Sequence, residues 1–405
     1  MHSNDISFLE ELSLLRYQIQ LRFGKAIVNA NDCNALSSAV FESTGQLVSS
    51  QTFRRLFKII AGEGRISRST ADILALYCGF DNLHQLVGRQ IKLDTTQTDR
   101  VLEANIYKTF FDVEVPKIKK GELNVVYFNV INGILKRVFE DKQLYDTLIP
   151  LISENPTAHY YLFEQFPYIS GFGNGFDAGY KLYLKYKTDA EAQVFGNAML
   201  FLAAILQNKY IDAKAYYDAI SKYSIEELQH PFILARYLGT KIVYHHITGD
   251  HTTKQEVLGV LQSRLNTDDN INRYGFHSFN IEFELLISEY LCLADCYELV
   301  VEILLPVYEN KDLIPGEMDK GFWLMPMKIM MIRALSYTNR HEEAKALIPL
   351  VTDLNWLVDD YFSIQLLDAK RRMVSDSAEQ SVIDKELSEL IFKTKFSYFE
   401  PLPQE

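Results

Sequence analysis

The residues best suited to binding a polyanion lie in one stretch, 49–68. Its single acid is Glu63, and its five basic residues give it a net charge of +4; they are Arg54, Arg55, Lys58, Arg65 and Arg68. Residues 1–92 carry +2 in total, whereas the rest of the chain carries −14. Because nucleic-acid binding is mainly neutralisation of phosphates by Lys and Arg, the acidic remainder would be repelled. Any nucleic-acid contact is therefore expected within residues 1–92.

Other reactive residue types form no catalytic or metal-binding pattern. Segment 171–179 is rich in glycine, but it lacks the preceding strand and the Gly-Lys-Ser/Thr of a phosphate loop, so we interpret it as a connection between helices. His245 and His246 are adjacent and would point to different sides of a helix. The cysteines are interpreted as packing residues, since they supply no four-ligand zinc site; they are Cys33, Cys78, Cys292 and Cys296. We predict no enzymatic activity, no metal and no cofactor.

Composition and the N-terminal residues favour a cytoplasmic globular protein. Apolar residues make up 48% of the 405 residues and charged residues 23%, which is ordinary for a chain that buries a core. No stretch reaches the roughly 18 uninterrupted apolar residues of a membrane helix. The start, Met1–Asp5, lacks the basic residues of a signal peptide. We therefore expect no membrane contact.

The first ninety or so residues show the pattern of short, capped helices. Apolar residues recur every three or four positions between 5 and 29, which predicts one amphipathic helix. Further helices are predicted at 34–44, 50–60, 68–78 and 82–90. Either Ser49 or Ser50 can cap the helix at 50–60, and either Ser67 or Ser69 the next one, after which Gly79 supplies a left-handed stop.

A polar break at 94–99 has no apolar anchor and no period, so we interpret it as a linker. It leads us to expect three regions. These are a helical domain at 1–93, a helical connecting region at 94–189 and helical repeats at 190–405.

The repeats share a signature: a turn, then an aromatic ring, then a small residue that opens an apolar helix. Its small-residue position is spaced by 44, 43 and 44 residues, and a fifth unit is expected near Ser388; the four positions are Ala213, Val257, Val300 and Ala344. A period of this size indicates stacked helix pairs. Each pair needs its neighbours to bury its apolar face.

The many aromatic residues of the repeats leave two interpretations open. They either pack between the long helices or line a groove that holds a peptide or a partner helix. The residues considered for such a groove are Tyr216, Tyr217, Tyr237, Tyr244, Phe279 and Phe283.

Residues 34–90 resemble the helix-turn-helix domain of phage repressors. The resemblance is carried by Val48-Ser49-Ser50-Gln51-Thr52-Phe53, and by the Ser-Thr opening and the Gly79 stop downstream. It implies that 34–44 is the first helix of the motif and 49–60 the recognition helix. The turn at 44–48 is longer than the family's usual turn.

This resemblance implies double-stranded DNA as a partner. In that geometry the N-terminal residues of the second helix meet base edges, where Gln can pair with adenine and Arg with guanine. Basic residues farther along would meet phosphates. The implied DNA-binding residues are Ser49, Ser50, Gln51, Thr52, Arg54, Arg55, Lys58, Arg65 and Arg68.

The repeats in 190–395 resemble tetratricopeptide repeats through their small residues, Ala213 and Ala344, and their rings, Tyr210 and Tyr297, although the period is near 44 rather than 34. The order of the two domains is similar to that of bacterial transcriptional regulators. It implies an all-α fold, a small helix-turn-helix-like domain followed by an α-solenoid of tetratricopeptide-like helix pairs. The repeats would bind a peptide, a protein or a small ligand, and a homodimer would bind DNA. The alternative is a non-catalytic protein-interaction scaffold that binds no DNA.

Overall fold

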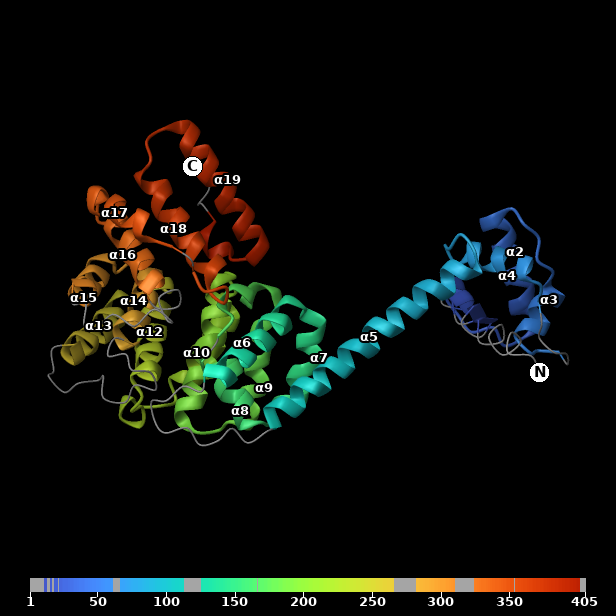
Figure 1. Ribbon diagram of the computed structural model, residues 1–405, viewed down its shortest axis with the longest axis horizontal. Coiled ribbons are helices and arrows are strands. Elements are labelled where there is room, and N and C mark those ends of the chain that lie inside the picture. Colours follow the sequence, from blue (N-terminus) through green and yellow to red (C-terminus); the bar gives the residue numbers. More distant parts are fainter. Residues whose placement is uncertain are drawn as a thin grey trace. The chain divides into compact units, whose positions relative to one another are not determined.

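The computed structural model describes residues 11–12, 15–16, 18–20, 22–60, 66–112, 125–165, 167–265, 282–309, 324–352 and 354–400. These residues form helices and the connections between them, and none of them is in a strand, which confirms the all-α fold class. The chain divides into two compact units, Met1–Leu102 and Glu103–Glu405 (Figure 1). Each unit has its own apolar core.

The first unit is built from short helices around one small core. Helical residues between 11 and 23 bury Leu12, Leu15 and Ile19 completely, as the apolar period predicts. Phe53 and Leu56 are equally buried. The helices that follow are α2 (Ala30–Thr44), α3 (Ser50–Leu56), α4 (Arg68–Tyr77) and α5 (Leu83–Asp112).

Serine side chains cap α3 and α4. Ser49 Oγ accepts a hydrogen bond from the Thr52 amide at 3.2 Å, and Ser67 Oγ accepts one from the Thr70 amide at 3.2 Å. These bonds satisfy amides that lack a helical partner, and they select Ser49 and Ser67 from the predicted pairs. Gly79 has a φ of 88°, which confirms the left-handed stop.

Helix α3 ends earlier than predicted, at Leu56 instead of residue 60. Lys58 takes a left-handed conformation with a φ of 56°. The amides of Lys58 and Ile59 then bond back to the carbonyls of Arg55 and Arg54, at 3.1 and 2.8 Å. This is a Schellman motif, in which a left-handed residue closes the helix by satisfying its last carbonyls.

The polar segment 94–99, predicted to be a linker, is helical and continues α5. No proline or glycine occurs from residue 89 to residue 112, so no residue type there interrupts the helical hydrogen bonds. The expected boundary between residues 93 and 94 falls inside this helix, whereas the two units divide after Leu102.

The described residues of the second unit include five helix pairs in sequence. We call α10, α12, α14, α16 and α18 the first helices, and α11, α13, α15, α17 and α19 the second helices. The pairs are α10 (Ala190–Leu206) with α11 (Tyr210–Ile220), α12 (Pro231–Ile247) with α13 (His251–Leu265), α14 (Glu282–Leu293) with α15 (Tyr297–Glu309), α16 (Met325–Tyr337) with α17 (His341–Leu347), and α18 (Asp359–Met373) with α19 (Ser377–Thr394). Each first helix contacts its own second helix and the first helix of the next pair, so the pairs stack in chain order (Figure 1).

A left-handed residue makes the turn within each of the first four pairs. These residues have φ values of 55°, 70°, 55° and 60°; they are Asn208, Gly249, Asp295 and Asn339. Asn, Asp and Gly are the residue types that tolerate this conformation best. The repeated turn found in the sequence is therefore a repeated backbone geometry.

The register assigned to the second pair is wrong. Ala213, Val300 and Ala344 are the fourth residues of their helices and are fully buried. The fourth residue of α13 is Lys254, not Val257. Lys254 reaches across to donate a hydrogen bond to the Ala294 carbonyl at 2.7 Å. A lysine thus stands where α11 and α17 have an alanine and α15 has a valine. The spacing of 44, 43 and 44 residues pointed to Val257 instead.

The segment before the first pair completes the second unit. Its longer helices are α6 (Val125–Glu140), α7 (Lys142–Ile152) and α9 (Gly179–Tyr186), and its short ones are α8 (Pro156–Ala158), the π-helix η1 (His159–Gln165), and the 3-10 helices η2 (Ile169–Asn174) and η3 (Phe176–Ala178). Further 3-10 turns are η4 (Ile225–Glu227), η9 (Ile348–Leu350) and η10 (Ser397–Phe399). Residues of this segment share one core with the helix pairs.

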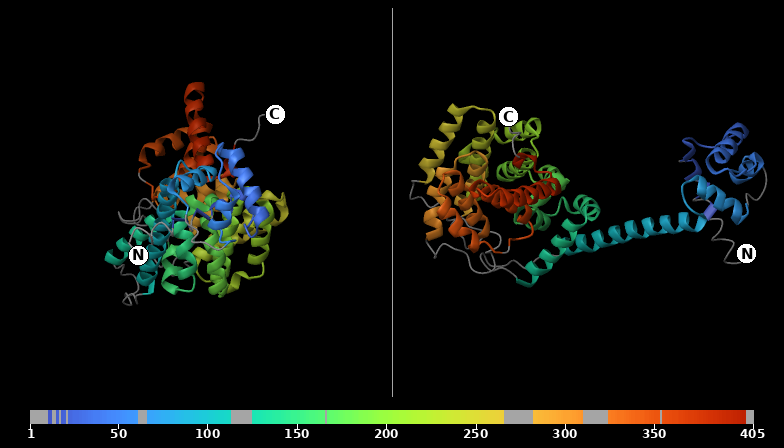
Figure 2. Two further views of the ribbon diagram at one scale, coloured as in Figure 1. Left: turned by 90° about the vertical axis from the view of Figure 1, so that its right-hand side faces the viewer. Right: turned by 90° about the horizontal axis from the view of Figure 1, so that it is seen from above.

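The last helix pair packs against this early segment. Both α18 and α19 contact η2, so residues near 170 and near 390 lie side by side (Figure 2). Asn174 donates a hydrogen bond to the Lys393 carbonyl at 2.9 Å, and Ser170 Oγ accepts one from the Tyr361 amide at 3.4 Å. A Cβ on Gly173 would overlap the Thr394 carbonyl oxygen. The glycine-rich stretch therefore connects helices, as predicted, and also permits this close approach.

We expect Gly173→Ala to destabilise the second unit by about 1–3 kcal/mol, because the added methyl must displace the α19 backbone. Calorimetric unfolding of the full chain measures this. The control is Gly259→Ala on α13, where the new Cβ meets no atom within 4 Å. That change should stabilise by up to about 1 kcal/mol, since alanine favours helix over glycine. Equal effects of the two substitutions would contradict the packing of α19 on η2.

The capping geometry separates two neighbouring serines. Ser49→Ala removes the bond to the Thr52 amide and should cost about 1 kcal/mol of stability of the first unit. Ser50→Ala, one residue later and inside the helix, should be neutral or slightly stabilising. Urea unfolding followed by far-UV circular dichroism compares the two. A larger loss from Ser50→Ala would contradict the assigned cap.

Candidate nucleic-acid interface and ligand cavity

Helix α3 has a polar face that is exposed and an apolar face that is buried in the core, and the buried face sets the orientation of the helix. Phe53 and Leu56 anchor it in the core, whereas Gln51 and Arg55 are exposed. Gln51 and Arg55 are four residues apart, so they lie on the same face one turn from each other. The turn before α3 is held as well, because Val48 is 4% exposed and its carbonyl accepts a hydrogen bond from Ser37 Oγ on α2 at 2.6 Å.

The other predicted DNA-binding residues have different surroundings. Ser49 and Thr52 are engaged in the cap, where their hydroxyls lie 2.9 Å apart. Arg54 is half-buried and donates a hydrogen bond to Asn34 Oδ1 on α2 at 3.3 Å. Lys58 and Arg68 are exposed and Ser50 is half-buried. Arg65 lies outside the described residues.

The aromatic residues predicted for a groove are not gathered in one. Tyr217 stacks on Tyr244 with ring centroids 3.7 Å apart, which joins α11 to α12. Tyr237 is buried and donates to the Tyr223 carbonyl at 2.9 Å. Phe283 is fully buried, Tyr216 is half-buried against the core, and Phe279 lies outside the described residues.

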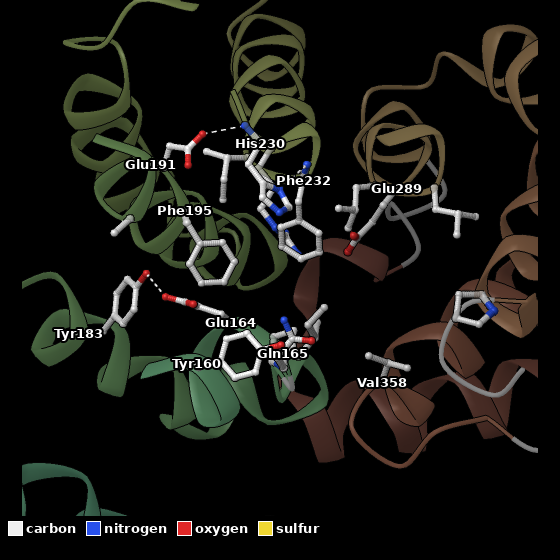
Figure 3. Close-up of a pocket in the computed structure, with 18 of the residues that line it drawn as sticks. Tyr160, Glu164, Gln165, Tyr183, Glu191, Phe195, His230, Phe232, Glu289 and Val358 are labelled. Atoms are coloured by element: carbon white, nitrogen blue, oxygen red, sulfur yellow. Dashed lines mark hydrogen bonds between the residues drawn. The ribbon is translucent and has the colours of Figure 1, made fainter. Parts of the chain in front are cut away.

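The second unit has a cavity of about 230 Å³ that none of those aromatic residues lines. Its walls come from η1, from the segment that leads into α10, and from all five first helices (Figure 3). Apolar side chains predominate; they are Pro167, Ile169, Ala192, Phe195, Phe232, Ile233, Leu285, Leu286, Pro326, Met330, Val358 and Phe362. Cavities of this kind, mostly apolar with a few polar groups, are typical ligand sites.

Two charged side chains in the cavity wall are buried among these apolar groups. Arg236 is 1% exposed and Glu289 is 4% exposed. Arg236 donates one hydrogen bond, to the Tyr290 hydroxyl at 3.4 Å, and its Nε has no partner among the described residues. One carboxylate oxygen of Glu289, Oε1, also has no partner there. Leaving buried polar groups unpaired is costly.

The ring faces of Phe195 and Phe232 lie beside Arg236. The guanidinium carbon is 5.6 Å from the Phe195 centroid and 4.8 Å from the Phe232 centroid. Such cation–π contacts compensate part of the cost of burying the charge. In Figure 3 the two rings and the Glu289 carboxylate point toward one another.

Burial shifts the titration of the groups around the cavity. It raises the pKa of Glu289, which the charge of Arg236 only partly opposes. It lowers the pKa of His230, against the pull of Glu191 and Glu164. Both shifts favour the neutral form, whereas an arginine stays charged.

The acids nearer the outside have partners. Glu164 accepts a hydrogen bond from the Tyr183 hydroxyl at 2.8 Å and pairs with Lys187. Glu191 accepts from the amides of Gln229 and His230 at 2.8 and 2.7 Å (Figure 3). The third acid, Asp189, caps α10 through the Ala192 amide.

Sequence reasoning missed this cavity, although it left a signal. Arg236 and Glu289 interrupt strongly apolar helical runs, at 231–243 and 283–294. Charged residues are almost never fully buried unless they are paired, so a charge at a core position marks a place of interest. The sequence pattern did not show that five helices pack together around these two residues.

Within the part of the chain that the structure describes, no three His, Cys, Asp or Glu side chains lie together as metal ligands would. Burial raises the pKa of Cys78 and of Cys292 to about 12, so both thiols stay protonated near neutral pH. Cys33 and Cys292 are buried and free, which confirms their assignment as packing residues. None of the described helices is both long enough and apolar enough to cross a membrane.

The raised pKa of Glu289 makes stability depend on pH. The folded chain holds this proton more tightly than the unfolded chain, whose Glu titrates near 4.5, so the penalty for burying the carboxylate grows as the pH rises above that value. Glu289→Gln removes the penalty. We expect it to raise the melting temperature at pH 7 to 8 more than at pH 4.5. A larger gain at the lower pH would contradict this environment.

Comparisons with known proteins identify no relative. No family model, no curated protein and no solved structure matches the chain. The function therefore has to be inferred from the two surfaces described above.

Proposed function

We propose that this chain is a cytoplasmic DNA-binding transcriptional regulator. Its first unit would bind double-stranded DNA through α3, and its helix pairs would bind the molecule that controls it. The observation that supports this most directly is the outer face of α3, where Gln51 and Arg55 are exposed one turn apart on a helix anchored by Phe53 and Leu56.

The arrangement of α2 and α3 fits a helix-turn-helix motif. In such motifs the second helix enters the major groove while the first crosses the backbone. Five residues join the two helices, more than the usual three or four. The buried Val48 and its hydrogen bond from Ser37 make this longer turn a fixed one, which a recognition helix requires.

The residues of α3 divide by their surroundings into two roles. Gln51 and Arg55 are free to read bases, because Gln pairs with adenine and Arg with guanine in the major groove. Lys58 and Arg68 would contact phosphates. Arg54 is held by Asn34 on α2, so we assign it to fixing the angle between the two helices.

Charge favours the same surface. The stretch 49–68 carries +4 and the chain beyond residue 92 carries −14. A phosphate backbone would therefore approach the first unit and avoid the helix pairs. Two copies would bind two half-sites, as symmetric regulators do.

The helix pairs would supply control. Their left-handed turns and stacked first helices support the tetratricopeptide-like assignment. A ligand changes DNA affinity only if it binds the DNA-competent arrangement with a different affinity. The cavity contacts all five first helices, so its occupant could favour one packing of the stack.

We expect the full chain to bind a mixed-sequence duplex in a salt-dependent manner. Fluorescence anisotropy over a series of salt concentrations measures both the affinity and its salt slope. Arg55→Ala should weaken binding by about 1–3 kcal/mol if Arg55 contacts a base. If it contacts a phosphate instead, the salt slope should fall by about one.

The charge-matched control is Lys385→Ala on α19, an exposed lysine far from the first unit along the chain. It should leave both quantities unchanged. The proposed DNA-binding function is excluded if the full chain does not bind the duplex at low salt. It is also excluded if Arg55→Ala and Lys385→Ala have the same effect on DNA affinity and on its salt slope. The chain would then be the interaction scaffold without DNA binding.

A further inference from the structure

Among the described residues of the second unit, two arginines are buried, and they differ in how their charges are compensated. Arg333 is 3% exposed and forms an ion pair with Asp368, with Nε 3.0 Å from Oδ2. Arg236 is more deeply buried and forms no ion pair with any described carboxylate; its hydrogen bond goes to the Tyr290 hydroxyl. A buried charge without a counter-charge is costly. The same fold thus provides a carboxylate for one arginine and leaves the other facing a cavity.

No other side chain in the cavity wall supplies the missing counter-charge for Arg236. Glu289 lies in the same cavity, but its burial favours the protonated form. The outer acids are committed, Glu164 to Tyr183 and Lys187, and Glu191 to two backbone amides. His230 is held toward its neutral form and Lys187 is paired, so Arg236 is the one permanent unpaired cation among the residues that line the cavity.

The other side chains that line the cavity indicate which ligand would fit beside Arg236. The same cavity is lined by apolar side chains, which favour an apolar or aromatic body; they include Phe195, Phe232, Leu285, Met330 and Phe362. The volume of about 230 Å³ exceeds the roughly 150 Å³ that holds benzene. On that scale an apolar body of about nine non-hydrogen atoms fits. Arginine is suited to an anionic oxygen pair because its planar fork donates two parallel hydrogen bonds.

We propose that this cavity binds a small organic acid whose carboxylate pairs with Arg236 and whose compact apolar body packs between the first helices. Its biological role rests on the proposed function, in which the helix pairs hold the controlling ligand. The binding itself requires no DNA, so it can succeed or fail independently of the regulator.

The test uses three compounds of similar size that differ in charge: phenylbutanoate, its amide, and phenylbutylamine. Isothermal titration of the full chain without DNA gives the three affinities. A charge-assisted bond to a buried arginine predicts that the acid binds at least about tenfold more tightly than the amide, and more tightly still than the amine. The acid alone should raise the melting temperature clearly.

Three results would overturn the proposal. Preferential binding of the amine would mean that the cavity's carboxylates select the ligand. Equal binding of acid and amide would mean that Arg236 recruits no charge. Failure of the acid to saturate in the millimolar range would exclude this ligand class.

Matched substitutions inside and outside the cavity locate the interaction. Arg236→Met keeps the length and apolar stem but removes the charge, and it should abolish the preference for acid over amide. Arg340→Met makes the same change at an arginine that pairs with Glu343 outside the cavity, so as the matched control it should keep that preference. If Arg236→Met does not fold, Arg236→Lys keeps the charge but loses the planar fork, and it should narrow the preference. Unchanged acid binding in a folded Arg236 variant contradicts the proposal.

Discussion

The second unit depends on the need to cover two first helices, α10 and α16, that are buried on nearly every side. Every residue of α10 from Val194 to Leu206 is buried, as is every residue of α16 from Met325 to Ser336. Such helices cannot lie at a surface and need cover all round. Their own second helices cover one side and neighbouring first helices cover others. Helix α10 is also covered by α9, η2, η3 and η10. The stack follows from that requirement.

The same requirement makes the buried charged residues of the first helices informative. An unpaired charge in a fully covered helix raises the free energy of the folded state unless something compensates it. Arg333 is compensated within the chain by Asp368. Arg236 is compensated only in part, by the rings of Phe195 and Phe232. Its position at a cavity makes an external partner the simplest account of its presence.

Local features of the fold could be predicted from the sequence, and long-range ones could not. The caps at Ser49 and Ser67, the stop at Gly79 and the repeated turns depend on residues within a few positions of one another. The packing of Gly173 on α19 joins residues more than 200 positions apart, so no local sequence pattern predicts it. The cavity is of the same kind, since Arg236 matters only where five helices meet. The outer face of α3 could be predicted in part. The position of the helix followed from the sequence, but the hydrogen bond from Arg54 to Asn34 on α2 did not.

The central claim is that DNA meets the chain at α3. Hydrogen–deuterium exchange of the full chain, with and without a mixed-sequence duplex at low salt, tests it directly because it reports every segment at once. We expect the amides of α3 and of the start of α4 to exchange more slowly when DNA is bound, and those of the helix pairs to change little. Protection confined to the helix pairs, or no change anywhere, would contradict it.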